Sequence, residues 1–530
     1  MIPIAARVVE VLAGSDEVDT GPWVSGSGFL IGKRLVLTAG HVVEHGAPRV
    51  RRTTPGFPPS KQVWTARVVM LADPAVADLA LLEVEGDLGD IPPIGFAQVD
   101  RELGRAGLVE SFAVGFPDYK TLSTGTNVVV RESVQVNGVI PTAEDLYSRL
   151  LTLRFANAPT AEAAPGRSSW SGMSGAAVLA DGYVLGVVST HDPRHGQSQL
   201  TVTPMSRIAH LADAERWWRA LGVDRAWLPV LPKPEAQCVG ALPPVEDHHP
   251  RLGCGLDMMA AIQACGRVVL TSHQEGVGGT GKTHLASHYA RSLWSGEDVD
   301  LVVWVSADRR DKILRIYQEA AAAIGVDSFP HWLATTHRRW LVVLDDVVNT
   351  GDLEALWPPD RPNGRVLITV RDGVVAPPAG QDHRVVEVGL FSPDEAAAYI
   401  RSCTGCTVQE AEALATDLAF HPLALAQAVA FMRRAKLDCH AYSQRFLRRD
   451  RQLPRLMRGT GARGDLQKSK VAVAWSLSVE TPDVRAASHI RYQRTTTRDG
   501  TQTETVEADD AQSMERALKQ ILRGGGGMDD

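Results

Sequence analysis

One short glycine-rich stretch restricts the fold of this chain more than any other feature. Residues 276–283 read Gly-Val-Gly-Gly-Thr-Gly-Lys-Thr, which fits the pattern G-x-x-x-x-G-K-[ST]. The apolar run at 267–271 predicts a buried strand just before the loop, and residues 284–294 predict a helix just after it. A glycine loop between a strand and a helix N-terminus can wrap its backbone N–H groups around a phosphate. The alternative is a plain glycine-rich turn, but the flanking strand and helix favour nucleotide binding.

Each residue of this loop has an expected role. Lys282 would reach the outer phosphates, and the Thr283 hydroxyl would ligate Mg²⁺. Glycines let the backbone approach a phosphate without a side chain in the way. The glycines expected to do so are Gly276, Gly278, Gly279 and Gly281. The expected cofactors are therefore ATP or ADP, with Mg²⁺.

Two later apolar strands end in polar groups suited to the same site. Residues 339–347 end in Asp345 and Asp346, of which the first would hold Mg²⁺ through water and the second would orient the hydrolytic water. Residues 364–370 lead into Arg371, which would sense the terminal phosphate. Strands alternating with helical stretches predict a parallel sheet with helices on both faces.

The first third of the chain has a different character. Residues 1–225 contain many short β-like runs separated by Gly, Pro and Asp, which predicts an all-β barrel or sandwich. All six cysteines lie after residue 237, so no disulfide framework can hold this region together. The cysteine pattern favours a reducing compartment, and we expect the protein in the cytoplasm and not in a membrane.

Within this region a histidine, an aspartate and a serine occur in a telling order. His41 follows a predicted strand, Asp78 precedes another, and Ser174 stands between glycines. Each residue alone would be ordinary, but together they match the order His, Asp, Ser of one class of catalytic triad. A serine hydroxyl becomes nucleophilic when an imidazole takes its proton and a carboxylate orients that imidazole. The backbone N–H groups of Gly172 and Ser174 would then face the developing oxyanion.

The motifs around these three residues resemble those of a trypsin-like serine protease. The matching stretches are Thr38-Ala-Gly-His41, Asp78-Leu-Ala-Leu-Leu and Gly172-Met-Ser-Gly, and the resemblance covers most of residues 5–225. It implies a double barrel of the chymotrypsin type and a protein or peptide substrate. It also implies three residues at the substrate pocket: Ser168 at its base, His191 beside it, and Ser189, which would also support the triad carboxylate.

One departure from the secreted members of that family bears on regulation. Met173 precedes the nucleophile, where secreted members have an aspartate that captures a newly cut N-terminal ammonium. Activation by proteolytic trimming is therefore not expected.

The order of motifs in the second region resembles the NB-ARC type of STAND ATPase. The glycine loop is followed by Trp304-Val-Ser, Leu344-Asp-Asp, Thr369-Val-Arg and finally Leu418-Ala-Phe-His-Pro-Leu-Ala-Leu, within about residues 250–480. The family includes switch modules of plant resistance, apoptosome and bacterial defence proteins. The resemblance implies that Pro422 contacts the nucleotide, that bound ADP locks a resting state, and that activation brings several copies together.

These patterns predict a multidomain chain with five segments. Residues 1–225 form the protease-like domain, 226–250 a linker with six prolines, 251–385 the α/β nucleotide-binding core, 386–480 a helical extension reaching into a winged-helix region, and 481–530 a polar, disordered tail with one short helix near 513–522. The linker prolines are Pro229, Pro232, Pro234, Pro243, Pro244 and Pro250.

The leading hypothesis is a nucleotide-gated serine endopeptidase acting in defence or cell death. Because no sensing repeats are found, it is either a short form of its family or relies on a separate sensor partner. One alternative is a signalling ATPase whose protease-like domain only binds peptides. Another is a DNA-binding regulator, because residues 433–470 hold twelve Lys and Arg against three Asp. The net charge of −7 over 530 residues gives no overall field that would attract nucleic acid.

Overall fold

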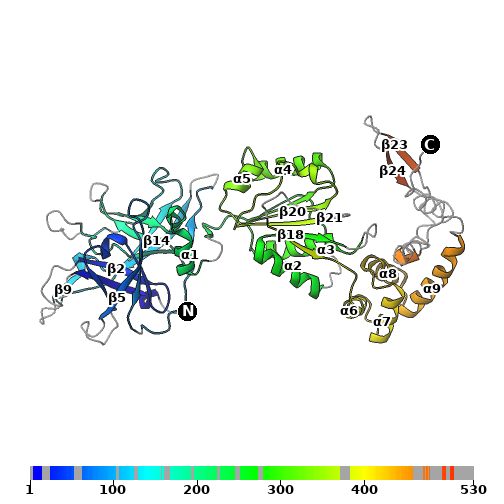
Figure 1. The fold of residues 1–530 in the computed structure, drawn as a ribbon, viewed down its shortest axis with the longest axis horizontal. Helices are drawn as coiled ribbons and strands as arrows, with labels where there is room; N and C mark the ends of the chain where they lie inside the picture. Colours follow the sequence, from blue (N-terminus) through cyan, green and yellow to red (C-terminus); the bar gives the residue numbers. More distant parts are fainter. Residues whose placement is uncertain are drawn as a thin grey trace. The chain divides into compact units, whose positions relative to one another are not determined.

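A computed structural model of the 530-residue chain describes most of the first 456 residues and short pieces beyond them. The described ranges are 4–14, 24–52, 63–86, 88–102, 107–123, 129–156, 158–159, 168–192, 196–223, 227–244, 251–272, 279–370, 382–456, 470–471, 473–474, 477, 492–496 and 502–506. The chain divides into two compact units, which are described separately (Figure 1). The first comprises Met1–Gln237, Val299–Leu301 and His331–Trp340, and the second Cys238–Asp298, Val302–Pro330 and Leu341–Asp530.

Two closed six-stranded barrels make up most of the first unit, as the sequence predicts. The first barrel has the order β1-β2-β3-β6-β5-β4, formed by Val8–Gly14, Val24–Leu30, Leu35–Thr38, Ala80–Val84, Val63–Leu71 and Ala47–Arg51. The second has the order β11-β12-β15-β14-β13-β8, formed by Val134–Pro141, Leu151–Arg154, Gln199–Pro204, Tyr183–Thr190, Ala177–Ala180 and Leu108–Gly115. Closing each sheet into a barrel leaves no unpaired edge strand.

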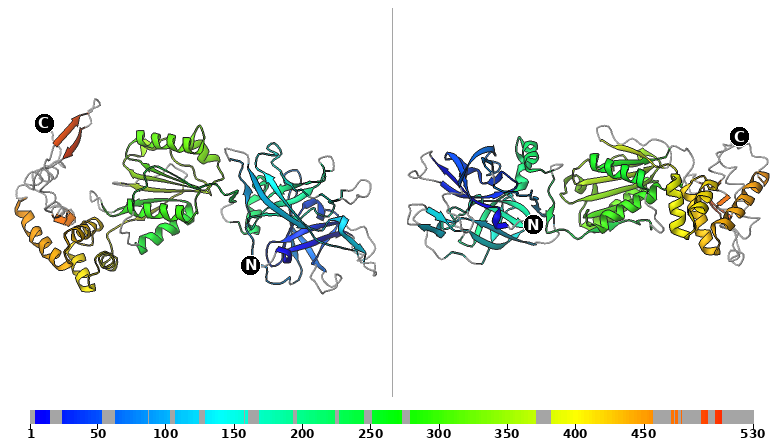
Figure 2. Two further views of the ribbon diagram at one scale, coloured as in Figure 1. Left: turned by 180° about the vertical axis from the view of Figure 1, so that it is seen from behind. Right: turned by 90° about the horizontal axis from the view of Figure 1, so that it is seen from below.

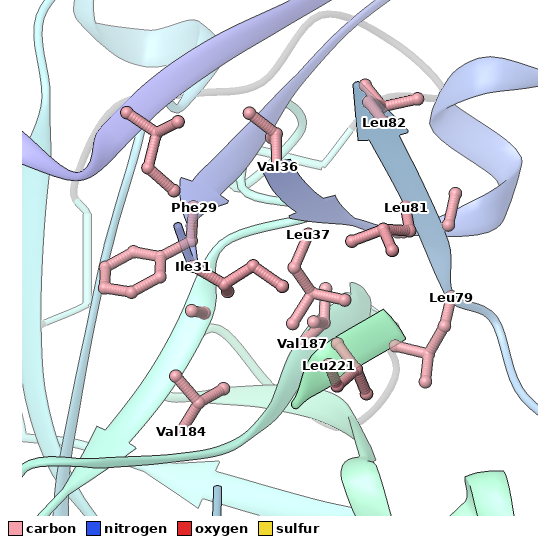
Figure 3. Close-up of a cluster of buried hydrophobic side chains, with 14 of the residues drawn as sticks. Phe29, Ile31, Val36, Leu37, Leu79, Leu81, Leu82, Val184, Val187 and Leu221 are labelled. Atoms are coloured by element: carbon pink, nitrogen blue, oxygen red, sulfur yellow. The ribbon is translucent and has the colours of Figure 1, made fainter. Parts of the chain in front are cut away.

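The core of the first barrel extends beyond its own strands. Val184 and Val187 of β14 and Leu221 of helix α1 (Ala214–Leu221) pack into the same buried cluster as Leu37 and Leu81 (Figure 3). Full burial of such an aliphatic side chain is worth about 1.5–3 kcal/mol. The shared cluster therefore joins the two barrels, and the segments that lie between them are held from both sides.

The second unit contains a six-stranded sheet in the order β17-β19-β20-β21-β18-β22, formed by Gln237–Val239, Leu301–Ser306, Trp340–Val347, Gly364–Val370, Arg267–Thr271 and Arg384–Glu387. Strand β18 runs parallel to both of its neighbours. Helices α2 (Leu252–Cys265) and α3 (Lys282–Ser295) cover one face, and α4 (Arg310–Ile324) covers the other (Figures 1 and 2). This is the α/β layering that the sequence predicts.

A helical extension follows the sheet, also as predicted. Its helices are α6 (Pro393–Thr404), α7 (Val408–Asp417), α8 (Pro422–Ala435) and α9 (Cys439–Leu456), which share one buried apolar cluster. Ser392 and Thr407 begin α6 and α7 with reciprocal bonds to glutamates three residues on, Glu395 and Glu410. Such capping boxes satisfy N–H groups that a helix start leaves unpaired. No helix within the described ranges is long and apolar enough to span a bilayer.

Two of the predicted segments contain strands. The proposed linker 226–250 provides β16 (Val230–Leu231), which pairs in parallel with β7 (Gln98–Val99), as well as β17. Val230 and Leu231 are buried, so the apolar residues between the prolines dock and the segment is not a free spacer. In the predicted tail, β23 (Tyr492–Thr496) and β24 (Gln502–Val506) pair as an antiparallel hairpin, where a disordered chain was expected. Alternating threonines favour such pairing. The helix predicted near 513–522 lies outside the described residues.

Candidate functional site

His41 and Asp78 are joined by two hydrogen bonds in the first unit. His41 lies in a single 3₁₀ turn, Gly40–Val43, immediately after β3, and Asp78 lies in the segment that leads into β6. The Asp78 carboxylate accepts from the His41 backbone N–H at 2.9 Å and contacts the ring Nδ1 at 2.7 Å. Strands β3 and β6 pair in the first barrel, which brings the two residues together. This contact fixes both the position and the orientation of the imidazole.

Each residue shifts the pKa of the other. The hydrogen bond to Asp78 raises the pKa of His41 above its ordinary value of 6.5, against the opposite effect of burial. Burial works to raise the pKa of the Asp78 carboxyl, but the hydrogen bonds from His41 outweigh it and leave that pKa below its ordinary value. Asp78 is therefore ionised at neutral pH, where it can hold the imidazole and stabilise its protonated form.

Ser174 lies in a tight loop that only glycines permit. Gly172 and Gly175 have φ values of +90° and +92°, which side chains other than glycine rarely adopt. A Cβ on Gly175 would lie 1.9 Å from the Ser27 carbonyl oxygen. The Ser174 Oγ donates to the Ser189 carbonyl at 3.0 Å, and within the described part of the chain no hydrogen bond joins it to His41. The hydroxyl must leave the Ser189 carbonyl before it can pass a proton to the imidazole.

The backbone of this loop presents two N–H groups. Ser27 binds the loop twice, because its Oγ donates to the Gly172 carbonyl at 2.7 Å and its N–H donates to the Ser174 carbonyl at 2.7 Å. Among the described residues, the N–H groups of Gly172 and Ser174 have no protein acceptor. Such a pair of N–H groups can receive an oxyanion. Ser27 was not recognised in the sequence, because its partners lie far away along the chain.

The three residues expected at the substrate pocket contact one another or the nucleophile. His191 Nε2 lies 2.9 Å from the Gly196 carbonyl, which can only accept, so the proton is on Nε2. His191 Nδ1 therefore accepts from the Ser168 hydroxyl, which in turn accepts from the Trp170 N–H at 3.0 Å. This chain of bonds places an imidazole against the residue expected at the base of the pocket.

The Ser189 side chain does not make the contact with Asp78 that the resemblance implies. Its hydroxyl donates to the Thr201 carbonyl at 3.3 Å, and no bond to Asp78 occurs among the described residues. The register of β14 against β15 shifts between Val188 and Thr190, which turns this residue away from the expected direction. Ser189 instead contributes its backbone carbonyl, which accepts from Ser174.

In the second unit, the predicted nucleotide residues converge at the start of α3. Thr283 Oγ1 donates to Asp345 Oδ1 at 2.8 Å, and Lys282 Nζ donates to Ser272 Oγ at 3.1 Å. Thr369 Oγ1 donates to the same Asp345 oxygen at 2.6 Å. Burial raises the pKa of Asp345, and these hydrogen bonds only partly offset the effect. A hydroxyl, a carboxylate and an ammonium thus lie at the carboxyl ends of β18 and β20.

The remaining residues predicted to bind the nucleotide are only partly described by the structure. Asp346 follows Asp345 with φ at +63°, and its N–H donates to Thr369 Oγ1 at 2.8 Å. Gly279 and Gly281 have positive φ values of +89° and +94°. Pro422 opens α8, and the next residue, Leu423, lies against Gly279, whose added Cβ would come within 2.7 Å of the leucine Cβ. Gly276, Gly278 and Arg371 lie outside the described residues.

Two residues beside the loop were missed in the sequence. Arg251 donates to the Thr280 carbonyl and to the Gly389 and Leu390 carbonyls, each at 2.8 Å, so it ties the loop to the chain that leads to α6. His421, the residue before Pro422, is fully buried, and neither ring nitrogen has a partner within the described structure. Burial lowers the pKa of His421. Arg251 belongs to no recognised sequence motif. His421 lies within the motif Leu418-Ala-Phe-His-Pro-Leu-Ala-Leu, but only Pro422 of that motif was assigned a role.

Comparisons with known proteins agree with this division of the chain. A family model for the trypsin-like peptidase domain matches residues 26–187, and a model for the NB-ARC domain matches residues 264–405. A search of curated proteins found no match.

Solved structures similar to this chain include three peptidase-like folds. They are the active form of the Rv3671c protease from M. tuberculosis (21% identity, 39% of this chain and 79% of that chain, TM-score 0.27), Deg5 (19% identity, 39% and 87%, TM-score 0.25) and an inactivated protease paralogue of the scabies mite (14% identity, 41% and 93%, TM-score 0.28). The two barrels, the sheet and the two family matches lead to one conclusion: the chain joins a trypsin-like peptidase domain to an NB-ARC domain.

Proposed function

We propose that this chain is a nucleotide-gated serine endopeptidase, in which an ADP/ATP switch in the second unit controls a peptidase in the first. The observation that carries the proposal is the pair of hydrogen bonds by which Asp78 holds His41. A carboxylate that fixes both the backbone and the ring of a histidine leaves the far ring nitrogen for proton transfer. The glycine loop around Ser174 supports the same reading, because it presents two N–H groups.

The proposed reaction begins when the Ser174 hydroxyl turns from the Ser189 carbonyl to His41. His41 takes the hydroxyl proton as the serine oxygen bonds to the scissile carbonyl carbon, and Asp78 stabilises the imidazolium that forms. The negative charge on the carbonyl oxygen then meets the N–H groups of Gly172 and Ser174. His41 next returns the proton to the leaving amine, and water releases the acyl group by the same route.

The nucleotide-binding residues have the chemistry that a magnesium nucleotide requires. Mg²⁺ prefers oxygen ligands, and the Thr283 hydroxyl and Asp345 carboxylate are adjacent oxygen donors, 2.8 Å apart. Thr283 and Asp345 would hold the ion, Asp346 would orient a water, and Lys282 would neutralise the outer phosphates. Pro422, Gly279 and Gly281 would line the nucleotide, together with Gly276, Gly278 and Arg371. When bound, the ion would neutralise charge that develops on the phosphates.

We further propose that bound ADP holds the chain at rest and that exchange for ATP brings several copies together. A protein substrate would then be cleaved in the cytoplasm during a defence or cell-death response, with a separate partner sensing the trigger. Met173 stands before the nucleophile, where an aspartate would be needed to capture an N-terminal ammonium, and this supports control by an attached switch.

The test uses the purified full chain with a fluorogenic peptide library, in the presence of ADP and of ATP with Mg²⁺. Ser174→Ala is expected to abolish cleavage, and Lys282→Ala to abolish the difference between the two nucleotides. Ser198→Ala, which changes an exposed serine, and Lys312→Ala, in a surface ion pair on α4, are the matched controls and should behave as wild type. Cleavage that survives Ser174→Ala would contradict the peptidase. Cleavage that responds to nucleotide despite Lys282→Ala would contradict the gating.

Two observations favour a second candidate function, a signalling ATPase whose barrel domain only binds peptides. The Ser174 hydroxyl is bonded to Ser189, and His191 occupies the place beside Ser168. Labelling of Ser174 by a fluorophosphonate separates the two candidates. A competent triad reacts with the reagent and loses the reaction in His41→Ala, whereas a binding domain reacts no faster than that variant.

A further inference from the structure

A chain of charged side chains runs from the buried interior of the first barrel to the partly exposed Asp118 beside the nucleophile loop. Glu10, on β1, is fully buried, and its carboxylate lies opposite Arg51 on the paired strand β4. Arg51 Nε donates to one Glu10 oxygen at 2.8 Å, and Arg131 Nη1 donates to the other at 2.8 Å. Arg131 stands at the end of β10 (Val129–Arg131), and its Nε donates to Asp118 Oδ1 at 2.9 Å. Glu10 thus anchors Arg131, and Arg131 holds Asp118.

Asp118 in turn sets the direction of one peptide group. Its backbone N–H donates to the Ser171 carbonyl at 2.7 Å. In a trans peptide the C=O and N–H bonds point in opposite directions. Because the Ser171 carbonyl points to Asp118, the N–H of Gly172, which belongs to the same peptide, points away from it. This is one of the two N–H groups that face an oxyanion in the proposed reaction, and a rotation of the Ser171–Gly172 peptide would replace that donor by a carbonyl.

The other restraints on this loop do not act on that peptide directly. Ser27 binds the carbonyls of Gly172 and Ser174, which belong to the Gly172–Met173 and Ser174–Gly175 peptides and not to the Ser171–Gly172 peptide. Met173 is fully buried in the second barrel core and carries no charge. Gly172 has no Cβ and a φ of +90°, so no side chain of its own restricts the orientation of that peptide. The orientation of its N–H therefore depends on Asp118 more than on any other described contact.

We propose that Arg131 is a positioning residue for the oxyanion hole, acting through Asp118 on the Ser171–Gly172 peptide. The proposal rests on the proposed peptidase function. The ion chain supplies from inside the fold an electrostatic restraint on the nucleophile loop. Arg131 is suited to this part because its planar guanidinium donates to Glu10 and Asp118 from different nitrogens at once.

The experiment measures kcat and KM of the full chain on a fluorogenic peptide that the wild type cleaves. Arg131→Gln is expected to lower kcat about 10–100-fold and to leave KM nearly unchanged, because an oxyanion donor acts in the transition state and not on bound substrate. Inhibition by a peptide boronic acid, whose adduct places an oxygen in the hole, should weaken in parallel. Arg131→Lys keeps the positive charge but loses the planar guanidinium that donates from two nitrogens at once. Its kcat should therefore lie between those of Arg131→Gln and wild type.

Matched variants separate positioning from folding. Arg67→Gln removes an arginine that pairs with Glu83 on the surface of the first barrel, and it should leave kcat unchanged. Asp118→Asn keeps the backbone N–H but weakens the bond to Arg131, so its loss of kcat should be smaller than that of Arg131→Gln. Glu10 is unsuitable for substitution, because its removal would leave the Arg51 guanidinium buried without this carboxylate.

Active sites are counted by complete fluorophosphonate labelling, so that kcat refers to competent molecules. A merely structural Arg131 would lower the thermal midpoint and the number of sites, but not kcat per site. An unchanged kcat per site in Arg131→Gln would overturn the proposal and leave the peptidase function standing. A wild-type chain that neither cleaves nor labels would overturn the peptidase function, and this inference with it.

Discussion

The peptidase site and the nucleotide site hold their reactive groups in opposite ways. In the first, His41 and Asp78 already make the contact that the proposed catalysis would use, and the Ser174 hydroxyl is bonded elsewhere. In the second, the Thr283 hydroxyl donates to Asp345 and the Lys282 ammonium to Ser272, so the groups that would meet Mg²⁺ and phosphate already bind protein partners.

The two sites therefore differ in how much each must rearrange before it can act. The peptidase site needs a rotation of one hydroxyl, since the imidazole and the loop are already fixed by several bonds. The nucleotide site must accommodate its ligand around two existing internal hydrogen bonds, from Thr283 to Asp345 and from Lys282 to Ser272. A site of the second kind couples ligand binding to local rearrangement, which is what a switch requires.

The sharpest test of the preformed pair is Asp78→Asn. The amide cannot hold the imidazole in the required tautomer, so kcat should fall by about 10⁴-fold, as in the general triad case. The measurement is kcat on the fluorogenic peptide, with Asp90→Asn, at an exposed carboxylate paired with Lys33, as the matched control. A loss of less than about tenfold would show that the His41–Asp78 contact is not part of catalysis.

Thr283→Val tests the internally bonded site. Loss of the hydroxyl should weaken binding of magnesium ADP by about 10–100-fold, because one ligand of the ion is removed. Calorimetric titration with Mg²⁺ and with EDTA gives the sharper result. Chelation of Mg²⁺ by EDTA should weaken ADP binding strongly in the wild type and only slightly in Thr283→Val. Thr335→Val, at the end of α5 (Phe329–Thr335), is the control. Equal effects of EDTA on Thr283→Val and wild type would assign the metal to other residues.

The pH dependence of cleavage reports the state of His41. Its pKa is raised above 6.5, chiefly by the hydrogen bond to Asp78, so the ring stays protonated to higher pH than a free histidine. A general base must be neutral, and kcat/KM should therefore rise with pH through a midpoint above 6.5, about tenfold per unit below it. A midpoint below 6.5 in a kcat/KM profile would contradict the paired geometry.

The smallest expected effect concerns substrate choice. His191→Gly removes the imidazole that contacts Ser168, and peptides with larger residues before the cleaved bond should gain severalfold in kcat/KM relative to small ones. A peptide library measured on both proteins gives the comparison, with His210→Gly as a control at an exposed position. An unchanged ranking of substrates would place the pocket away from His191.

The parts of the molecule that were predictable are those encoded locally. His41 follows a short strand, Asp345 lies near the end of another, and the glycines around Ser174 permit positive φ, so each motif carries its own backbone conformation. The unpredicted parts depend on contacts distant in sequence. Arg131 reaches Glu10 across 121 positions, and Ser27 reaches Gly172 across 145.

The direction of a side chain and the docking of a segment also could not be predicted from local sequence patterns. The turn of the Ser189 hydroxyl toward Thr201 follows a strand irregularity that its sequence does not mark. The linker prolines concealed the pairing of Val230 and Leu231 with β7, because two apolar residues are too short a run to predict a strand. His421 was passed over because burial without a partner is visible only once the helices pack.

The double contact of Ser27 with the nucleophile loop bears on how this domain tolerates mutation. Ser27 belongs to the first barrel and the loop precedes a strand of the second, so a change in the small residues of β2 acts on the nucleophile without touching the triad. A side chain on the neighbouring Gly26 would come within 2.8 Å of the Ser174 carbonyl. Saturation mutagenesis of the peptidase domain should therefore find positions 26–27 as intolerant of substitution as Ser174. Among homologues, substitutions at 26–27 should be accompanied by substitutions at 172–175.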